Sequence, residues 1–232
     1  MFNGIVYNQG IIKKIKKSSR YVSGSLVLEI ASNIKFKKTD IGESVSCDGV
    51  CLTLIRINKK TFSFYLSKET IKRSNFKYAK IGKIINIEKS ILHGQKISGH
   101  YVQGHVDTTA KVKSINIIDK SWLIKLGLEN KKLYKYLIEK ASISINGVSL
   151  TISKVSKKYF EINVIPHTLK LTNLRKLKPK NIVNIELDIY SIWSEDNSEC
   201  IGKEITSFTI WFVTGNIEES TSGFLYAFCM CK

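Results

Sequence analysis

The sequence predicts an all-β protein in which two related antiparallel barrels follow one another along 232 residues. Three observations carry this prediction. One long segment occurs twice, most of that segment consists of short runs rich in β-branched and aromatic residues, and turn signals separate the runs at intervals of about ten residues. Short strands at even spacing are typical of antiparallel barrels, in which closure removes the exposed sheet edges.

The repeat has an offset of 98 residues. Asp-Gly-Val-Cys-Leu-Thr at 48–53 recurs as Asn-Gly-Val-Ser-Leu-Thr at 146–151, and alignment of 41–91 with 139–189 needs no gap and gives 18 identities in 51 positions. At an offset of 100, Gly4 and Val6 also pair with Gly104 and Val106. We therefore expect two homologous domains, residues 1–97 and 98–188, followed by an unpaired tail, residues 189–232.

The expected strands follow from composition and partial alternation. The first half contains such runs at 25–30, 50–55, 61–66 and 83–88, and the second half at 149–153, 159–164 and 181–186. Turn signals include Asp48-Gly49 and Asn146-Gly147. One helix is also predicted, because Asn130 can cap a segment in which Leu133 and Leu137 lie one turn apart.

Composition limits the compartment. The apolar runs at 205–213 and 224–230 are much shorter than the roughly 20 residues that a membrane-spanning helix needs. The lysines near the start follow the first apolar run, which is unlike a signal peptide, so a cytoplasmic protein is expected. The five cysteines lack a repeated spacing and are expected to be free thiols rather than disulfides or zinc ligands; they are Cys47, Cys51, Cys200, Cys229 and Cys231.

Residues 93–107 are rich in glycine and histidine. One interpretation is a backbone that closely approaches a ligand, and another is a domain connection whose glycines turn corners. A metal site made of His100, His105 and Asp107 is a third interpretation. It is weakened because two histidines five residues apart in a strand point to opposite faces.

The net charge of +18 raises the question of nucleic acid. The lysines are scattered through turns and strand ends, which favours a general basic bias over a binding groove. A nucleic-acid-binding barrel would need an aromatic platform beside a lysine groove. Phe62, Phe64 and Tyr65 are the candidates, although alternation sends two of them inward.

A set of short motifs resembles the riboflavin synthase family in order, spacing and duplication. The resemblance covers residues 1–188, and its motifs are Met-Phe-Asn-Gly-Ile-Val at 1–6, Gly-Val-Cys-Leu-Thr at 49–53, Lys-Glu-Thr at 68–70, Gly-His at 99–100, Gly-His-Val-Asp at 104–107, Gly-Val-Ser-Leu-Thr at 147–151, Ile-Pro-His-Thr at 165–168 and Val-Asn-Ile-Glu at 183–186.

The resemblance implies two tandem six-stranded Greek-key barrels and a C-terminal helix that assembles a homotrimer. It implies that two molecules of 6,7-dimethyl-8-ribityllumazine exchange a four-carbon unit without metal or organic cofactor, giving riboflavin and 5-amino-6-(D-ribitylamino)uracil. Each active site would lie between the N-terminal barrel of one subunit and the C-terminal barrel of its neighbour. No membrane or nucleic-acid partner is implied.

The resemblance also implies the residues of two substrate pockets. One substrate would contact the C-terminal Leu-Thr motif, a strand at 163–168 and two glycine segments, namely Gly4, Ile5, Val6, Gly104, His105, Val106, Ser149, Leu150, Thr151, Asn163, Val164, Ile165, Pro166, His167 and Thr168. The other would contact the N-terminal Leu-Thr motif, a strand at 65–70 and a partner-chain lysine, namely Cys51, Leu52, Thr53, Tyr65, Leu66, Ser67, Lys68, Glu69, Thr70 and Lys140.

The implied chemistry removes a proton from the C7 methyl group of one lumazine and adds a nucleophile at C7 of the other. His105 is the expected proton carrier, because imidazole titrates near neutral pH. Ser44 and Cys51 are expected to donate hydrogen bonds or to act as a transient nucleophile. Structural alternatives remain open: Cys51 as a small buried apolar residue, His105 as a satisfied histidine, and Ser44 as a turn or strand residue. Asn86 to Glu88 and the matching 184–186 are expected to serve barrel closure and hydrogen bonding, not catalysis.

The alternative function is a non-catalytic lumazine- or flavin-binding protein on the same barrels. Retention of Ser44, Cys51 and His105 together with both Leu-Thr motifs favours catalysis. After Asp188 the resemblance fades, and the segment at 207–213 lacks helical periodicity. The tail is therefore either a divergent trimerisation element or an abnormal C-terminus.

Overall fold

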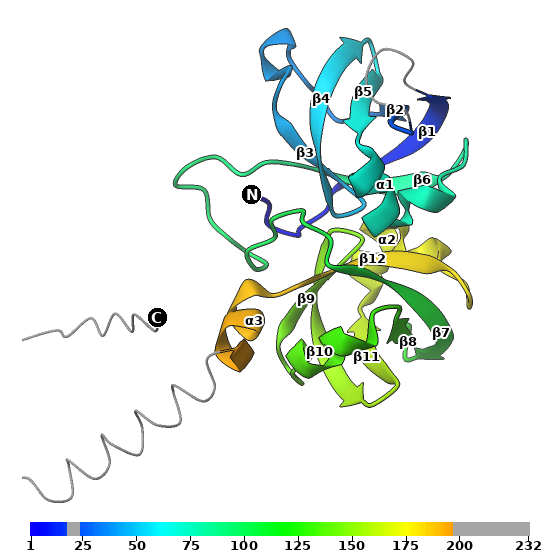
Figure 1. Ribbon diagram of the computed structural model, residues 1–232, viewed down its shortest axis with the longest axis vertical. Coiled ribbons are helices and arrows are strands. Elements are labelled where there is room, and N and C mark those ends of the chain that lie inside the picture. The colour runs from blue at the N-terminus through cyan, green and yellow to red at the C-terminus, as the bar shows by residue number, and fades with distance from the viewer. Residues whose placement is uncertain (18–23, 197–232) are drawn as a thin grey trace, which may run out of the picture. The chain divides into compact units, whose positions relative to one another are not determined.

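The computed structural model describes residues 1–17 and 24–196, and in that part of the chain twelve strands form two closed antiparallel barrels (Figure 1). The first barrel contains β1 (Asn8–Lys17), β2 (Leu26–Ser32), β3 (Ser44–Cys47), β4 (Val50–Asn58), β5 (Thr61–Leu66) and β6 (Ile84–Lys89). The second contains β7 (Thr108–Ile118), β8 (Ser121–Leu128), β9 (Ser142–Ile145), β10 (Val148–Ser156), β11 (Tyr159–Val164) and β12 (Ile182–Leu187). The predicted all-β fold of two six-stranded barrels is confirmed.

The two barrels have the same strand order. In the first it is β1-β2-β5-β4-β3-β6, and the second repeats it as β7-β8-β11-β10-β9-β12. Strands β3, β4 and β5 form consecutive hairpins, and β6 returns to pair with β3, which is the Greek-key arrangement. The expected division at residues 97 and 98 falls between β6 and β7 and stays a prediction.

The tips of two equivalent hairpins meet between the barrels. Asp48 and Asn146 have positive φ values of 48° and 47°, and each is followed by a glycine with φ of 78°. Two successive residues with positive φ are typical of the type I′ hairpin turn, which explains the Asp-Gly and Asn-Gly signals. A Cβ at Gly49 would lie 2.6 Å from the backbone nitrogen of Gly147, so only glycine permits this contact.

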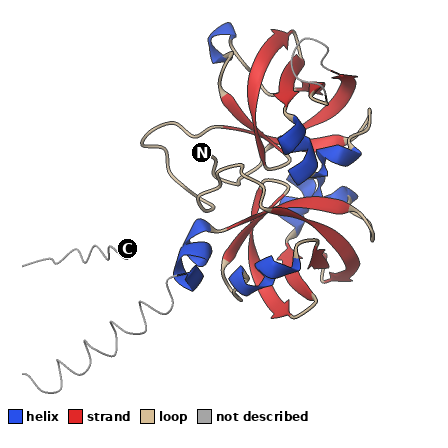
Figure 2. Ribbon diagram, in the orientation of Figure 1, coloured by secondary structure: helices blue, strands red, loops and turns tan. Residues whose placement is uncertain are grey.

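Short helices connect the strands (Figure 2). They are η1 (Lys38–Asp40), α1 (Lys68–Arg73), η2 (Asn75–Tyr78), η3 (Lys131–Tyr136), α2 (Pro166–Leu171), η4 (Asn173–Lys176) and α3 (Ile189–Asp196). In the described residues no helix is both long and apolar enough to cross a membrane.

The expected strands at 65–70 and 163–168 were wrong in their second halves. The strands end at Leu66 and Val164, and helices α1 and α2 follow. Ser67 caps α1, since its side chain accepts a hydrogen bond from the Thr70 backbone N–H at 3.0 Å. Pro166 occupies the first turn of α2, where its missing N–H costs no hydrogen bond. These two local signals outweigh the strand pattern.

The helix predicted after Asn130 is a short 3₁₀ helix, η3. The cap itself was predicted correctly, because the Asn130 side chain accepts a hydrogen bond from Lys132 N–H at 3.1 Å. The helix ends at Tyr136, so Leu137 of the predicted helix lies just outside it. Leu137 is buried instead in the core of the second barrel, and this burial fixes the chain without a further helical turn.

Each barrel has its own apolar core, and each core is contacted by one residue from the segment that precedes the other barrel. Val6, which precedes β1, lies in the core of the second barrel. Val106, which precedes β7, packs against the core of the first. The two N-terminal segments are therefore exchanged between the barrels, and Phe2 and Val102 form a small antiparallel bridge where they cross.

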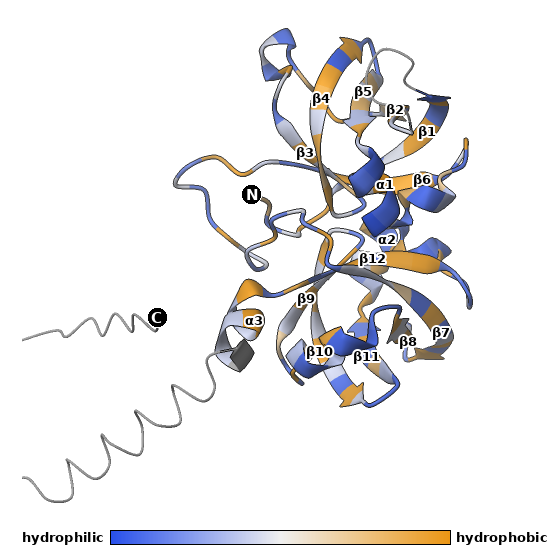
Figure 3. Cartoon of the chain, viewed as in Figure 1, coloured by the Kyte–Doolittle hydropathy of each residue, from blue (hydrophilic) through white to orange (hydrophobic). Residues whose placement is uncertain are grey.

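Strands β1 and β7 were not predicted because charged residues interrupt them. Strand β1 contains four lysines, and its buried residues are Gly10 and Ile12. Figure 3 shows mixed hydrophilic and hydrophobic colouring along such strands.

Cys47 and Cys51 are free, as expected. Cys200, Cys229, Cys231 and the segment at 207–213 lie outside the described residues.

Candidate functional site

The exchange of segments places a glycine backbone against each Leu-Thr motif. The Ser149 backbone N–H donates to the Gly4 carbonyl at 2.8 Å, and the Cys51 N–H donates to the Gly104 carbonyl at 2.8 Å. A Cβ at either glycine would lie 2.7 Å from the Cβ of its partner. Both glycines have positive φ, 72° and 81°. The repeat therefore builds two equivalent sites, each from one barrel and one exchanged segment.

Two buried glutamates hold these segments in place. Glu88 accepts hydrogen bonds from the backbone N–H groups of Asn3 and Gly4, at 2.8 and 3.1 Å. Glu186 accepts from those of Gln103 and Gly104, at 2.6 and 2.9 Å. Burial raises the pKa of each carboxyl to about 7, although the N–H donors act in the opposite direction. The expectation that the Asn-Ile-Glu motifs serve hydrogen bonding rather than catalysis agrees with this geometry.

The N-terminal site adjoins a cavity of about 540 Å³. Ser67, Thr70 and His105 line it together with Glu69 and Val106, and all five belong to the expected substrate set. Val50, Arg73, Ser74, Asp107, Asn130 and Leu133 complete the lining. The cavity thus joins α1, the exchanged segment and η3 of the other barrel.

Charged groups surround His105 in this cavity. His105 is exposed, and Glu69 forms an exposed ion pair with Arg73. Burial raises the pKa of Asp107, whereas the Leu187 N–H and the charges of His105 and Arg73 lower it. Asp107 accepts the Leu187 N–H at 2.8 Å, and it lines the same cavity as His105. An exposed imidazole with a carboxylate neighbour is suited to exchange protons with a bound molecule.

The C-terminal site contains a residue that the sequence analysis did not place in either pocket. His100 is 8% exposed, and its Nδ1 lies 2.7 Å from the Ser149 hydroxyl. Burial lowers the pKa of the imidazole, and Asp188 raises it to a smaller extent. His100 therefore favours the neutral form, which can accept a proton from Ser149. The recurrence of Gly-His at 99–100 and 104–105 was the signal that could have identified it.

The Ser-Thr pairs of the two sites are equivalent. Ser44 faces Thr53 across β3 and β4, and Ser142 faces Thr151 across β9 and β10. Both threonines are exposed and both serines are half-buried. Ser142 is thus a second residue that the sequence analysis missed, although the repeat offset pairs it with Ser44.

The remaining expected residues differ in exposure. Lys68, Asn163, Ile165, Pro166, His167 and the partner-contact candidate Lys140 are exposed. Cys51, Tyr65, Ser149, Leu150, Thr168 and Ile5 are half-buried. Four of the expected residues are buried in the barrel cores, so their side chains pack in the core; they are Leu52, Leu66, Val164 and Val6.

Two expectations about the glycine segments need correction. The segment 104–106 was grouped with the C-terminal Leu-Thr motif, but it lies against Cys51 of the first barrel, because the segments are exchanged. His100 and His105 were expected in one strand, whereas both lie outside regular strands. Their separation follows from the same exchange, since one approaches Ser149 and the other the α1 cavity. Among the described residues no three His, Cys, Asp or Glu side chains form a metal-binding group.

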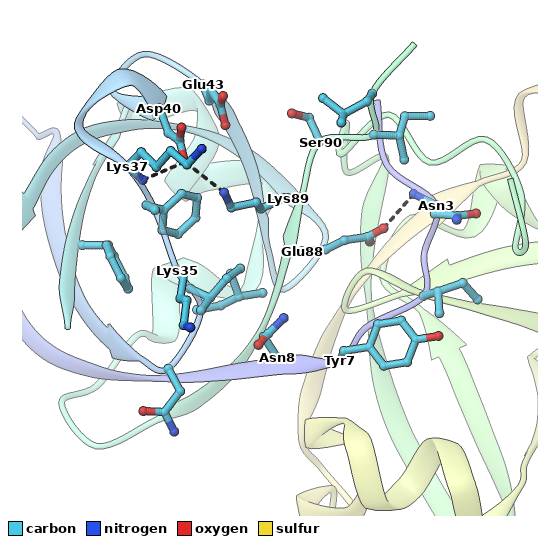
Figure 4. A pocket seen from close by; sticks show the side chains of 18 of the residues that line it. Asn3, Tyr7, Asn8, Lys35, Lys37, Asp40, Glu43, Glu88, Lys89 and Ser90 are labelled. Carbon is cyan, nitrogen blue, oxygen red and sulfur yellow. Dashed lines mark hydrogen bonds and ion pairs between the residues drawn. The ribbon is translucent and has the colours of Figure 1, made fainter. Parts of the chain in front are cut away.

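A larger cavity, of about 1600 Å³, lies elsewhere (Figure 4). Asp40, Lys89, Glu88 and Asn3 lie along it, and of the expected substrate set it contains only Ile5. Two of its carboxylates are already bonded within the protein, since Asp40 pairs with Lys89 at 2.9 Å and Glu88 accepts the Asn3 N–H at 2.8 Å. Size alone therefore does not identify the functional site here.

Two equivalent barrels, each with a Leu-Thr motif beside an exchanged glycine segment, define a duplicated barrel with two equivalent candidate sites. Comparison with known proteins agrees with this class. The model of the lumazine binding domain matches residues 3–90 and again 103–188.

Relatives with known names are similar over most of the chain. Riboflavin synthase of Buchnera aphidicola subsp. Schizaphis graminum is 33% identical, over 89% of this chain and 99% of its own. Riboflavin synthase of Escherichia coli (strain K12) is 35% identical, over 81% and 87%. The chain belongs to the riboflavin synthase family of lumazine-binding proteins.

Solved structures with a similar fold hold flavin-related ligands. LumP complexed with 6,7-dimethyl-8-(1'-D-ribityl) lumazine is 25% identical, with a TM-score of 0.68 over 81% of this chain and 99% of that chain. LumP complexed with riboflavin is 26% identical, with a TM-score of 0.69 over the same shares.

Proposed function

We propose that this protein is a riboflavin synthase. It would convert two molecules of 6,7-dimethyl-8-ribityllumazine into riboflavin and 5-amino-6-(D-ribitylamino)uracil by transfer of a four-carbon unit. The observation that carries the proposal is the pair of equivalent sites, each with a Leu-Thr motif, a Ser-Thr pair and a glycine segment. A reaction between two identical molecules needs two similar pockets, and binding both in register supplies a large part of the barrier lowering.

The differences between the two sites suit the unequal roles of the two substrates. The C-terminal site has the neutral His100 beside Ser149, 2.7 Å apart, and we assign to this pair the removal of a proton from the C7 methyl group. The N-terminal site has Cys51 in place of Ser149 and an exposed His105. There Cys51 or Ser44 would assist addition at C7 of the acceptor, with His105 carrying the proton.

The substrate ring and its ribityl chain need several polar contacts besides these groups. Thr53, Thr70 and Thr151 offer hydroxyl groups close to the two Leu-Thr motifs, and Ser67 and Ser149 add two more. The four-carbon transfer is a dismutation, so its atoms and electrons balance without an added oxidant.

Conversion of the lumazine tests the proposal against its alternative. LumP structures with bound lumazine and riboflavin favour a binding protein as the second candidate. Purified full-length protein is incubated with the lumazine, and the products are separated by chromatography. Accumulation of riboflavin supports the enzyme, whereas tight binding with no turnover at any protein concentration supports the binding protein.

Subunit complementation tests the expected homotrimer. Each active site would combine the N-terminal barrel of one subunit with the C-terminal barrel of the next. Two variants, Ser44→Ala with Cys51→Ala and His100→Asn with Ser149→Ala, are each expected to be nearly inactive. When they are co-expressed with different tags, mixed trimers contain some sites with both intact barrels and regain activity. Activity of the mixture no higher than the average of the two separate variants would argue against a shared site.

A further inference from the structure

A third cavity lies at the seam between the two barrels, and it shares no lining residue with the cavity beside α1. It measures about 740 Å³, and one wall comes from the loop around η2 and β6 while the other comes from the equivalent loop around η4 and β12. None of its lining residues belongs to the expected substrate set. We call it the seam cavity, and its lining residues are Asn75, Tyr78, Lys80, Gly82, Lys83, Ile84, Lys111, Asn146, Asn173, Lys176, Leu177, Lys180, Asn181 and Ile182.

The charge of the seam cavity is one-sided. Five lysines line it and no aspartate or glutamate does. Lys83 has a partial partner, because its Nζ lies 3.2 Å from the Asp48 carboxylate, which is fully buried. In the described part of the chain, Lys80, Lys111, Lys176 and Lys180 have no carboxylate partner within ion-pair distance. Four ammonium groups around one hollow repel one another, and a multivalent anion relieves that repulsion.

The floor of the cavity is rigid and already hydrogen-bonded. Asn75 donates to Asn146 at 3.2 Å, and Asn173 donates to Asp48 at 2.7 Å. Asn75, Asn146 and Asn173 line the cavity, and they and Asp48 are buried and held by these hydrogen bonds. Recognition therefore falls to the lysines at the rim and to Tyr78, whose side chain is exposed and carries a hydroxyl group.

We propose that the seam cavity binds the di- or triphosphate group of a small molecule. Lysine binds phosphate as a flexible point charge, and several lysines on opposite walls can contact successive phosphoryl groups at once. A hollow of this size between two loops holds a compact ligand, whereas an extended nucleic-acid strand needs a continuous groove with stacked aromatic rings. This proposal is independent of the proposed enzymatic function, because the two sets of residues do not overlap.

The test measures binding of inorganic triphosphate to the full-length protein. Isothermal titration calorimetry gives the affinity at low and at physiological salt. Binding is expected at low salt, and the affinity is expected to fall about tenfold at higher salt, because the ion pairs between lysine and phosphate are solvent-accessible. The variant K80Q/K176Q/K180Q removes three charges from the rim and is expected to weaken binding about tenfold or more. The control K38Q/K131Q/K132Q removes the same charge from exposed positions outside the cavity and is expected to change binding less than about twofold.

Three outcomes would overturn the proposal. They are absence of triphosphate binding at low salt, equal weakening in both triple variants, and tighter binding of a single-stranded RNA oligonucleotide through the same three lysines. Equal weakening would mean that only the overall charge attracts the anion. Preference for RNA would make the seam a nucleic-acid surface. Circular dichroism of each variant verifies that the fold is retained.

Discussion

At the scale of single residues, the two sites depend on glycines that no other residue can replace. Gly104 has a φ of 81°, and a Cβ there would lie 2.7 Å from the Cβ of Cys51 and 2.8 Å from its backbone nitrogen. Gly94, in the same linker, has a similar φ of 79° but open space within 4 Å. Comparison of these two glycines separates the energetic cost of a side chain at positive φ from the cost of the close contact with Cys51.

We predict that Gly104→Ala destabilises the protein and reduces lumazine binding, whereas Gly94→Ala costs only about 1 kcal/mol, the penalty for a non-glycine residue at positive φ. The additional loss in Gly104→Ala arises because the exchanged segment must move away from Cys51. Urea unfolding of both variants measures the difference. Equal stability of the two variants would mean that the close contact is unimportant.

His100 carries the second residue-scale prediction. His100→Asn preserves a hydrogen-bonding atom near Ser149 but removes the group that accepts a proton, so we expect the turnover rate to fall about 10²- to 10⁴-fold. His93, which is exposed in the same linker, provides the matched control, and His93→Asn is expected to retain full turnover. Steady-state kinetics of riboflavin formation distinguishes the two. Unchanged turnover in His100→Asn would remove the histidine from the mechanism.

At the scale of elements, the exchanged segments are held by Glu88 and Glu186. Because the pKa of each is raised to about 7 in the folded protein from an ordinary value of 4.5, the folded protein binds more protons than the unfolded chain between these values. The stability that these two carboxyls contribute is therefore fully present below pH 4.5 and is lost as the pH rises through 7. From pH 5 to pH 8 the loss amounts to about 2 kcal/mol for each carboxyl.

The double variant E88Q/E186Q tests this pH dependence. Glutamine cannot ionise, so the difference in unfolding free energy between pH 5 and pH 8 is expected to shrink by about 4 kcal/mol relative to the unchanged protein. Denaturant unfolding at both pH values provides the measurement. An undiminished pH dependence in the double variant would show that the two glutamates are ionised throughout this range.

The elements also show how far the sequence can be interpreted. The repeat predicted both barrels, and β5 and β11 occupy their predicted residues, because apolar runs bounded by turns are local signals. Helices α1 and α2 were missed, since each is a single short segment that begins within two residues of a strand, with Ser67 as the cap of α1 and Pro166 as the first residue of α2.

The exchange of segments could not be predicted from local pattern. The offset of 100 between Gly4 and Gly104 shows that the two segments are equivalent, but not which barrel each contacts. That choice depends on long-range packing of Val6 and Val106. For the same reason His100 was not linked to Ser149, 49 positions further along the chain.

At the scale of the whole molecule, a ring of buried amides joins the barrels with near two-fold symmetry. Asn86 donates to the Asn146 carbonyl at 2.9 Å, and Asn184 donates to the Asp48 carbonyl at 2.8 Å. Symmetry fails at one pair of positions. The Asn146 amide donates to Asn173, at 3.5 Å, whereas Asp48 has no such donor, and the side-chain oxygen of Asn75 is left without a partner.

Exchange of the two unlike residues is predicted to have opposite effects. Asp48→Asn supplies the missing donor and is expected to stabilise the protein by about 1 kcal/mol. Asn146→Asp removes a hydrogen-bond donor and buries a carboxylate. The position equivalent to Lys83 is Asn181, which cannot form an ion pair with that carboxylate, so we expect the free energy of unfolding to fall by about 3 kcal/mol or more. Thermal unfolding of both variants at neutral pH measures the two effects. Destabilisation by Asp48→Asn would mean that the ion pair with Lys83 outweighs the added hydrogen bond.

The proposed function depends on two lumazine molecules reacting with each other in paired barrels. The most direct measurement is the molar balance of the reaction, with lumazine consumption and riboflavin formation followed together by absorbance. One riboflavin for every two lumazine molecules consumed is the predicted result. Binding of lumazine to the protein without any riboflavin, at every protein concentration, would contradict it.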